Sequence, residues 1–334
     1  MDFKNKRITI MGIGILGGGL GTAQFFAERG AHVLVTDLKS PDELKDSIQQ
    51  LAAYPIEYVL GEHRDNDFIE TDMVVRNPAI PAESTYLKIA RDHGVPVEMA
   101  ESLFLRLSPT KQIIGVTGTR GKSTTSALIF HILKTAGKDV YLAGNQKNTS
   151  TLQLLNSVKK DSVVVLELSS WQLESFGWHT ISPHIAVVTN VYPDHLNRYS
   201  SMEEYIQAKS NIFLFQNKED YLVLNKNNQI SSSFAPAAKS QIVWFSPKDW
   251  NDSHTLLLRG EHNRENAAAA CAVCRLLDVT DEGMFEAFKT FTGLPGRLER
   301  ISEVNGITII NDTTSTTPTA GIKALESFPE KKII

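Results

Sequence analysis

Cysteine is scarce in this chain of 334 residues, which holds only Cys271 and Cys274. Two cysteines cannot build a disulfide framework, so their number favours the reducing cytoplasm. Their spacing is that of a zinc-binding pair, but the sequence holds no second cysteine pair to complete such a site. Because both fall in a helical pattern over residues 267–277, we interpret them as buried thiols on one helix face.

Long apolar runs are also absent, and none approaches the ~20 residues of a membrane-spanning helix. Residues 8–20 are apolar and follow Lys4, Lys6 and Arg7, as in a signal peptide, but glycines interrupt them and no small-residue cleavage site follows. The 34 Lys and Arg residues are scattered through a chain of net charge -4. Neither nucleic acid nor a membrane is therefore an expected partner.

The chain does contain a regular alternation of short β-branched runs with longer helical patterns. Such alternation predicts an α/β fold built from parallel sheets with right-handed crossovers. The main predicted strands are residues 8–11, 33–36, 73–75, 112–116, 140–143, 163–166, 185–190 and 221–224.

Proline and glycine near residues 107–110 and 293–296 divide the chain into parts. A strand at 307–310, a helix near 319–327 and the start of a strand at 332–334 follow the second boundary. These last roughly forty residues are marginal for an independent domain. We expect a Rossmann-like domain over 1–95, a linker over 96–110, a central P-loop ATPase-type domain with a parallel or mixed sheet over 111–294, and the beginning of an incomplete third α/β domain over 295–334.

A first glycine loop, with Gly12, Gly14 and Gly17, follows a predicted strand and opens a helix, and Asp37 ends the next strand. That context is typical of a dinucleotide-binding fingerprint, which would make the protein an NAD-linked oxidoreductase. The alternative is a tight strand-to-helix turn that needs glycine for its backbone geometry.

A second glycine loop, residues 115–124, lies between the predicted strand 112–116 and a helix over 126–134. Backbone N–H groups in such a loop form a nest for phosphates. Lys122 would neutralise the β- and γ-phosphates of ATP, while the Ser123 hydroxyl would bind Mg²⁺. The spacing departs from the common P-loop, because Val116 stands five positions before Gly121 and the glycine falls at Gly118. We interpret this loop as a triphosphate site.

The loop variant at residues 117–124 resembles the Mur ligase family, and segments 167–174, 190–199 and 293–299 resemble its D-glutamate-adding members. The resemblance runs from the first strand to the end of the chain. It implies an ATP-dependent ligase that adds D-glutamate to UDP-N-acetylmuramoyl-L-alanine through an acyl phosphate, during synthesis of peptidoglycan precursors in the cytoplasm. It also implies two Mg²⁺ ions.

Glu167 has a chemical argument of its own, because it ends a predicted buried strand at the carboxyl edge of a parallel sheet. A carboxylate there is costly unless it meets a cation, and Mg²⁺ binds one or two carboxylates together with phosphate oxygens. The alternative is an acid that caps the following segment.

Two further catalytic residues depend on the resemblance. His195 by itself is typical of a loop histidine, and Lys209, in a predicted helix over 202–215, is typical of a solvated surface. The resemblance implies that His195 binds a second metal ion and the substrate. It implies that Lys209 is carbamylated by CO₂ and helps to hold that metal, which requires a lowered lysine pKa.

The remaining residues follow from the resemblance and from the two glycine loops. Asn263 and Asn266 could equally cap a helix. The nucleotide contacts are Gly118, Thr119, Arg120, Gly121, Lys122, Ser123, Thr124, Asn263, Asn266, Arg297 and Asp312. The precursor contacts are Gly14, Asp37, Lys39, Asn145 and His195. The metal ligands are Ser123, Glu167, His195 and Lys209.

Three positions depart from the family pattern: Thr314 replaces a usual lysine, Gly296 replaces a common histidine, and the first glycine loop is longer. Because the family's third domain is expected to be only begun in residues 295–334, an incomplete ligase that binds nucleotide or precursor without turnover is an alternative, beside the NAD-linked oxidoreductase. Folate-polyglutamating enzymes share the phosphate loop but are not expected to carry the segment 167–174.

Overall fold

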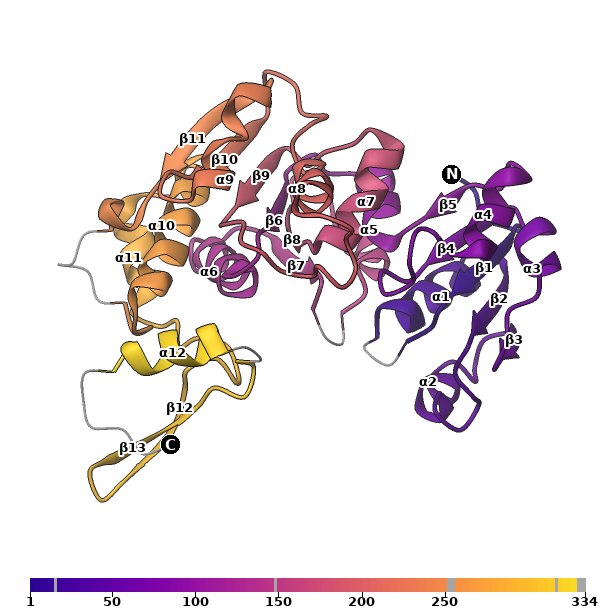
Figure 1. Ribbon diagram of the computed structural model, residues 1–334, viewed down its shortest axis with the longest axis horizontal. Coiled ribbons are helices and arrows are strands. Elements are labelled where there is room, and N and C mark those ends of the chain that lie inside the picture. The colour runs from indigo at the N-terminus through magenta and orange to yellow at the C-terminus, as the bar shows by residue number, and fades with distance from the viewer. Residues whose placement is uncertain (15–16, 147–148, 251–255, 316–317, 329–334) are drawn as a thin grey trace.

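The computed structural model describes residues 1–14, 17–146, 149–250, 256–315 and 318–328. Two parallel sheets and a short antiparallel ribbon succeed one another along the chain (Figure 1). The expected α/β class is confirmed. Across these ranges, no helix combines the length and apolar character that crossing a membrane requires.

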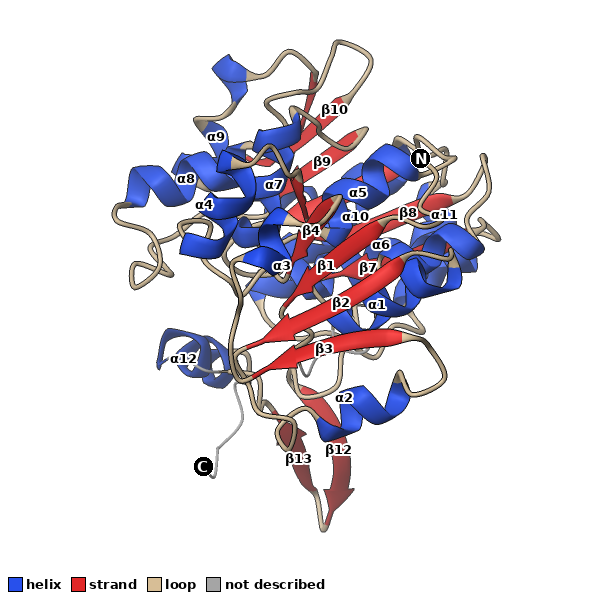
Figure 2. Cartoon of the chain, turned by 90° about the vertical axis from the view of Figure 1, so that its right-hand side faces the viewer, coloured by secondary structure: helices blue, strands red, loops and turns tan. Residues whose placement is uncertain are grey.

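The first sheet has five parallel strands in the order β3-β2-β1-β4-β5, the Rossmann order, and helices cover it (Figure 2). Residues 96–110, expected as a linker, contain β5 and α5, because β5 pairs with β4 at the sheet edge. The elements are β1 (Arg7–Met11), α1 (Gly18–Glu28), β2 (His32–Asp37), α2 (Lys45–Gln50), β3 (Ile56–Leu60), α3 (Asn66–Ile69), β4 (Met73–Arg76), α4 (Thr85–Asp92), β5 (Val97–Glu98) and α5 (Ala100–Leu107).

The second sheet has six strands in the order β11-β10-β9-β6-β8-β7, and every pair is parallel, not mixed. The strand expected over 185–190 ends at Val188, because Thr189 and Asn190 turn towards the loop after β6. The strands are β6 (Ile113–Thr117), β7 (Val140–Gly144), β8 (Val163–Glu167), β9 (Ile185–Val188), β10 (Tyr221–Asn225) and β11 (Gln241–Phe245).

Alternate residues of these strands enter different cores, because successive side chains point to opposite faces of a sheet. Ile113 packs with one cluster and Ile114 with the other. Cys271 and Cys274 are buried in the second cluster, and burial raises the pKa of Cys271 to about 12, so these are packing thiols. The helices are α6 (Lys122–Thr135), η1 (Leu152–Asn156), α7 (Ser170–His179), α8 (Met202–Ser210), α9 (Gln229–Ser232), η2 (Ala235–Ala237), η3 (Pro247–Asp249), α10 (Glu261–Arg275) and α11 (Asp281–Phe288).

The last described part is the antiparallel ribbon of β12 (Glu299–Val304) and β13 (Ile307–Asn311), followed by α12 (Pro318–Glu326). About half of the surface of Ile301, Val304 and Ile307 is exposed. The strand expected at residues 332–334 lies outside the described residues.

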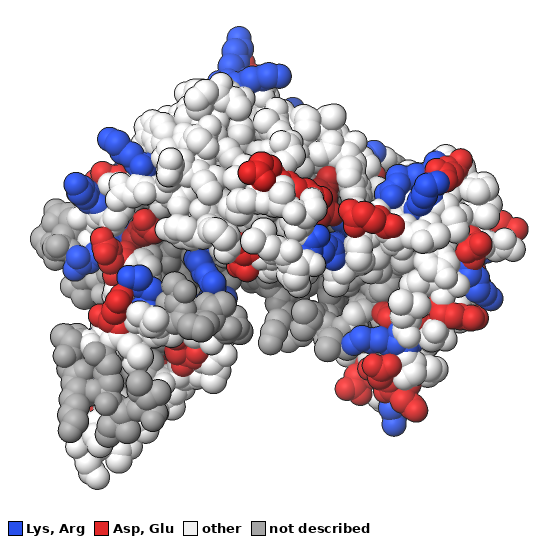
Figure 3. Space-filling view, in the orientation of Figure 1, with Lys and Arg blue, Asp and Glu red and all other residues white. Residues whose placement is uncertain are grey.

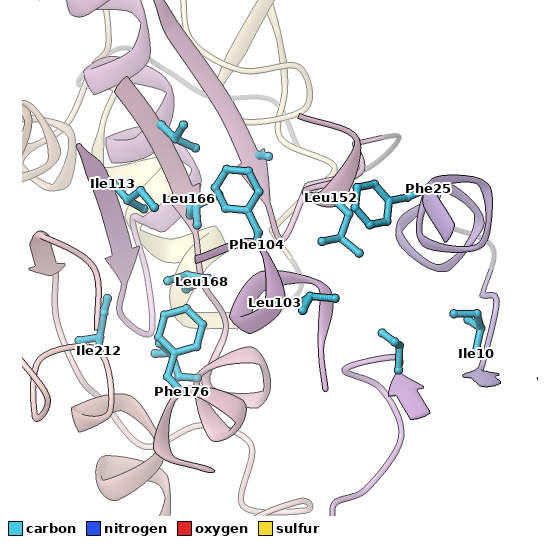
Figure 4. Packing of buried hydrophobic residues seen from close by; sticks show 14 of the residues in the cluster. Ile10, Phe25, Leu103, Phe104, Ile113, Leu152, Leu166, Leu168, Phe176 and Ile212 are labelled. Carbon is cyan, nitrogen blue, oxygen red and sulfur yellow. The ribbon is translucent and has the colours of Figure 1, made fainter. Parts of the chain in front are cut away.

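One hydrophobic core runs from the first sheet into the second. In Figure 4, Phe25 of α1 lies beside Leu152 of η1, and Phe104 of α5 lies near Leu166 of β8; all four side chains belong to one buried cluster. The contact between α1 and η1 is close enough that a side chain at Gly21 would overlap Ser150. The two sheets are therefore packed against each other through a shared core.

We expect Gly21→Ala to lower the free energy of unfolding by about 1–3 kcal/mol, because the added methyl group would push η1 away from α1. Gly18→Ala is the matched control on the same helix: nothing lies within 4 Å of its added methyl group, so it should gain about 0.5–1 kcal/mol. Denaturant unfolding measures both. Equal stability of the two variants would contradict the packing account, and Ser150→Gly should restore the Gly21→Ala protein.

Candidate active site at the carboxyl edge of the central sheet

The strand order places three loops together. β6 lies between β8 and β9, and the chain builds β7 and β8 on one side before crossing to β9 on the other. In open α/β sheets, the carboxyl edge at such a switch point is the usual ligand site. The loop after β6 carries the phosphate-loop glycines, β8 ends at Glu167, and the loop after β9 carries His195.

Two glycines of the phosphate loop are required by close approach. Gly118 and Gly121 both have positive φ, at 148° and 82°. A side chain at Gly118 would overlap the Thr189 hydroxyl, and one at Gly121 would overlap the Asn266 side-chain oxygen. The loop is therefore held between the end of β9 and the start of α10.

Asn190 fixes the loop from the β9 side. Its backbone carbonyl accepts from Thr119 N at 2.8 Å, and its side-chain Oδ1 accepts from Arg120 N at 2.8 Å. The Thr189 hydroxyl donates to the Arg120 carbonyl at 2.6 Å. These two loop amides are thus used internally, which leaves the anion nest to the N–H groups at the start of α6, where helical acceptors are lacking. Thr189 and Asn190 have no predicted role in the sequence. Two polar residues directly after a strand could have indicated that they hold a loop at the carboxyl edge of the sheet.

Two ammonium groups meet at one carbonyl oxygen of this loop. Lys122 Nζ donates to Gly118 O at 3.0 Å and to Thr119 O at 3.1 Å, and Lys209 Nζ donates to the same Gly118 O at 3.0 Å. Burial lowers the pKa of both lysines; Glu167 opposes the shift at Lys122, while the Lys122 charge adds to the shift at Lys209. Lys209 is 1% exposed, so the surface interpretation is wrong. Residues 211–215 are not in its helix, which ends at Ser210.

Glu167 supplies negative charge near Lys122. It is buried, and its Oε1 accepts from Asn145 Nδ2 at 3.2 Å. Its Oε2 is also buried, and within the described residues it has no hydrogen-bond partner. A buried carboxylate oxygen without a donor suits a cation, and Mg²⁺ fits because it combines few protein ligands with phosphate oxygens. Glu167 and Ser123 are the residues that would hold it.

No group of three or more His, Cys, Asp or Glu side chains in the described part of the chain is arranged to hold a metal ion alone.

His195 and Lys209 lie near the same aromatic ring, that of Tyr205. The His195 backbone is left-handed, with φ of 55°, and the His195 ring centroid lies 5.4 Å from Trp171 and 6.0 Å from Tyr205. Lys209 Nζ lies 4.6 Å from the same Tyr205 ring. Burial lowers the pKa of His195, against the opposing Asp194 charge, so its imidazole is neutral and able to bind a metal at pH 7.

The other residues expected to contact the nucleotide come from α10 and from the segment before the ribbon. Asn266 Oδ1 accepts from the Thr125 hydroxyl at 3.3 Å, and Asn266 Nδ2 donates to Asn263 Oδ1 at 3.2 Å. Arg297 Nη2 donates to the Ser123 hydroxyl at 3.3 Å, which brings the ribbon to the phosphate loop.

Asp312 accepts from Leu298 N at 3.1 Å, so it supports the residue beside Arg297. Thr314 and Gly296, two positions that depart from the family pattern, contact each other. The Thr314 hydroxyl donates to Gly296 O at 2.8 Å.

The residues expected at the first glycine loop lie at the carboxyl edge of the other sheet. Asp37 Oδ2 accepts from Ile13 N at 3.0 Å and from Gly14 N at 3.4 Å, and its Oδ1 accepts from Lys39 N at 3.0 Å. Asp37 is therefore held by the backbone of the first glycine loop and of the residues after β2.

Comparison with family models gives two matches: the Mur ligase MurD-like N-terminal domain over residues 6–98 and the Mur ligase middle domain over residues 116–255. A UDP-N-acetylmuramoylalanine--D-glutamate ligase from Roseiflexus sp. (strain RS-1) is 40% identical over 365 residues, which cover 100% of this chain and 78% of the relative. A ligase of the same name from Clostridioides difficile (strain 630) is 31% identical, with the same coverage.

The chain belongs to the Mur ligase family. As a Mur ligase it is an ATP-dependent enzyme that joins an acid to an amino acid.

Solved structures of Mur ligases share its fold. A UDP-N-acetylmuramate:L-alanyl-gamma-D-glutamyl-meso-diaminopimelate ligase from Neisseria meningitides matches with a TM-score of 0.62 at 18% identity, over 86% of this chain and 99% of that one. A UDP-N-acetylmuramate-alanine ligase from Thermotoga maritima matches with a TM-score of 0.60 at 21% identity, over 96% and 77%.

The buried Lys209 predicts a pH dependence of stability for this Mur ligase. Between its lowered native pKa and the ordinary value of 10.5, the unfolded chain binds one more proton than the native protein, so the free energy of unfolding rises with pH. In CO₂-free buffer between pH 7 and 8.5, we expect the native protein to gain up to about 1.4 kcal/mol per pH unit relative to Lys209→Met.

Urea unfolding at several pH values measures this difference. Lys218→Met, at an exposed lysine, should follow the native protein at every pH. Parallel curves for the native protein and Lys209→Met would contradict a buried amine with a lowered pKa.

Proposed function

We propose that this Mur ligase adds D-glutamate to UDP-N-acetylmuramoyl-L-alanine in the cytoplasm, using ATP and Mg²⁺. The similarity to ligases of that name supports the substrates. The observation that carries the proposal is the meeting of Lys122, Lys209 and Glu167 at the phosphate loop, because a transferred phosphoryl group requires cations and a metal ligand there.

The reaction needs activation, because a carboxylate is a poor electrophile. The terminal carboxylate of the precursor attacks the γ-phosphorus of ATP, ADP leaves, and an acyl phosphate forms. The amine of D-glutamate then attacks the acyl carbon, phosphate leaves with the bonding electrons, and the amine loses a proton. The protein must hold two anions in line and reduce their repulsion.

Lys122 does most of this work among the residues of the chain. Its ammonium group now bonds to the Gly118 and Thr119 carbonyls and exchanges them for the β- and γ-phosphate oxygens when ATP binds. The free amides at the start of α6 add fixed donors that need no rearrangement. Bound Mg²⁺ would supply positive charge beside the same oxygens, held by Glu167 and Ser123.

The neutral form of Lys209 is the form that reacts with CO₂, and burial beside Lys122 favours it. Reaction of this neutral amine with CO₂ would release one proton and leave a carboxylate near Lys122 and His195. Together with His195 it would provide ligands for a second Mg²⁺ ion.

We assign the precursor to the first sheet and the loops that face it. Residues 1–95 would bind the UDP end through Gly14, Asp37 and Lys39, while Asn145 and His195 would bind the muramoyl-alanine end. Residues 111–294 would bind ATP and the metal ions, and residues 295–334 would begin the domain for the amino acid.

The proposed function predicts ADP release that requires UDP-N-acetylmuramoyl-L-alanine, Mg²⁺ and D-glutamate together. A coupled ADP assay with a panel of D- and L-amino acids measures it. Lys122→Met and Glu167→Gln should each lower kcat by about 100-fold or more, because each removes charge from the phosphoryl-transfer site. Lys218→Met and Glu286→Gln, at exposed residues, are the matched controls.

Turnover with another amino acid but not with D-glutamate would show the substrate assignment to be wrong. Binding of ATP and precursor without any ADP release would favour the alternative of a chain that binds without turnover.

The proposed carbamate has a direct signature. In ¹³C-bicarbonate, we expect one slowly exchanging carbamate resonance near Lys209, strengthened by Mg²⁺, together with a rise in activity when CO₂ is restored to degassed enzyme. Lys209→Met should lose the resonance and the CO₂ response, and Lys218→Met should keep both. A native protein with full activity and no such resonance would refute carbamylation.

A further inference from the structure

A single loop, residues 77–82 after β4, lies between the two candidate binding regions. On one side it packs against the first glycine loop: a Cβ added to Gly12 would lie 3.0 Å from Ile80 Cδ1 and 3.1 Å from Asn77 Cβ. A Cβ added to Gly14 would lie 3.1 Å from Asn77 Nδ2. The glycine loop and this connecting loop are therefore in close contact.

On its other side the connecting loop is bound by an arginine from the second sheet. Arg198 Nη1 donates to Ala79 O at 3.0 Å, and Arg198 Nη2 donates to Ile80 O at 3.0 Å. Ile80 O also accepts from Arg76 Nη1 at 2.8 Å. The Ile80 carbonyl thus accepts from two guanidinium groups, that of Arg76 at the end of β4 and that of Arg198 in the loop after β9.

Arg198 is also tied to His195. The Arg198 backbone N–H donates to His195 O at 2.9 Å, and its guanidinium lies 4.8 Å from the centre of the Trp171 ring. That ring is the one that packs against His195 at 5.4 Å. A shift of the connecting loop would therefore be transmitted to the His195 segment through the Arg198 side chain.

A buried ion pair stiffens the same junction. Arg76, whose side chain is fully buried, donates to Glu174 of α7 at 2.5 Å, and Glu174 Oε1 accepts from the Tyr199 hydroxyl at 3.2 Å. Because Tyr199 follows Arg198, the segment is anchored on both sides of the arginine. Breaking such a buried pair is expensive, which makes Arg198 the better position for a test.

We propose that Arg198 is a positioning residue that couples occupancy of the first glycine loop to the placement of His195 beside the phosphate loop. The inference rests on the proposed function, because it assumes that a UDP-linked precursor binds at that glycine loop. Ordering of residues 77–82 by the precursor then orders the His195 segment, and the ATP site becomes better formed. Such coupling is reciprocal for the two ligands.

Calorimetric binding of a non-hydrolysable ATP analogue with Mg²⁺, with and without saturating UDP-N-acetylmuramoyl-L-alanine, tests the inference. In the native protein, we expect the precursor to tighten binding of the analogue by about fivefold or more. Arg198→Ala should reduce this factor to near one while leaving affinity for the analogue alone within about twofold. Arg198→Lys should fail to restore the coupling factor. One ammonium group cannot replace a planar guanidinium group that donates to two carbonyls and stacks on the Trp171 ring.

Arg91→Ala is the matched control. Arg91 Nη2 donates to Ala82 O at 2.8 Å, so it binds the same connecting loop. Arg91 lies on α4, which belongs to the same part of the chain as the first sheet. Arg91→Ala should keep the native coupling, and thermal unfolding should find it as stable as Arg198→Ala.

Unchanged coupling in Arg198→Ala, or two ligands that bind the native protein independently, would overturn the inference while leaving the proposed function intact. Failure of the native protein to bind either nucleotide would instead refute the proposed function.

Discussion

The carbonyl oxygen of Gly118 organises the active site, because the ammonium groups of Lys122 and Lys209 both donate to it. Two positive charges on one acceptor in a poorly solvated place would repel each other strongly. Burial and the Lys122 charge lower the pKa of Lys209, while the Glu167 carboxylate opposes the lowering of the pKa of Lys122. A bound triphosphate would bring further negative charge to this place. A carbamate on Lys209 would change the charge in the same direction.

The glycines of this Mur ligase serve different purposes that look alike in sequence. Gly118 lets Thr189, which follows β9, reach the phosphate loop, and Gly121 does the same for Asn266 of α10. Gly21 lets α1 pack against the segment before η1, and Gly12 contacts the loop after β4. The N-terminal glycines therefore serve a tight turn and the packing between sheets, and Asp37 accepts hydrogen bonds from the amides of that turn.

The charged surface adds little to this account. Figure 3 shows Lys and Arg interspersed with Asp and Glu on the face in view, without one large area of a single sign. The informative charges are the buried ones at two places: the phosphate loop, and the junction where Arg76 meets Glu174. Both places lie at carboxyl ends of central strands, one in each sheet, so the fold brings charge to the two edges where ligands bind.

By itself the sequence determined the central strands of both sheets, the phosphate loop and the place of Glu167 at a strand end, because these depend on local patterns: β-branched runs, glycine spacing and an acid at a strand end. It also carried the family resemblance. Only the tertiary structure decided that Lys209 is buried, that Asn190 uses two loop amides, and that Arg198 bridges the sheets. A lysine in a helix has the same local pattern whether it faces water or a loop 91 residues away, and only chain packing distinguishes the two.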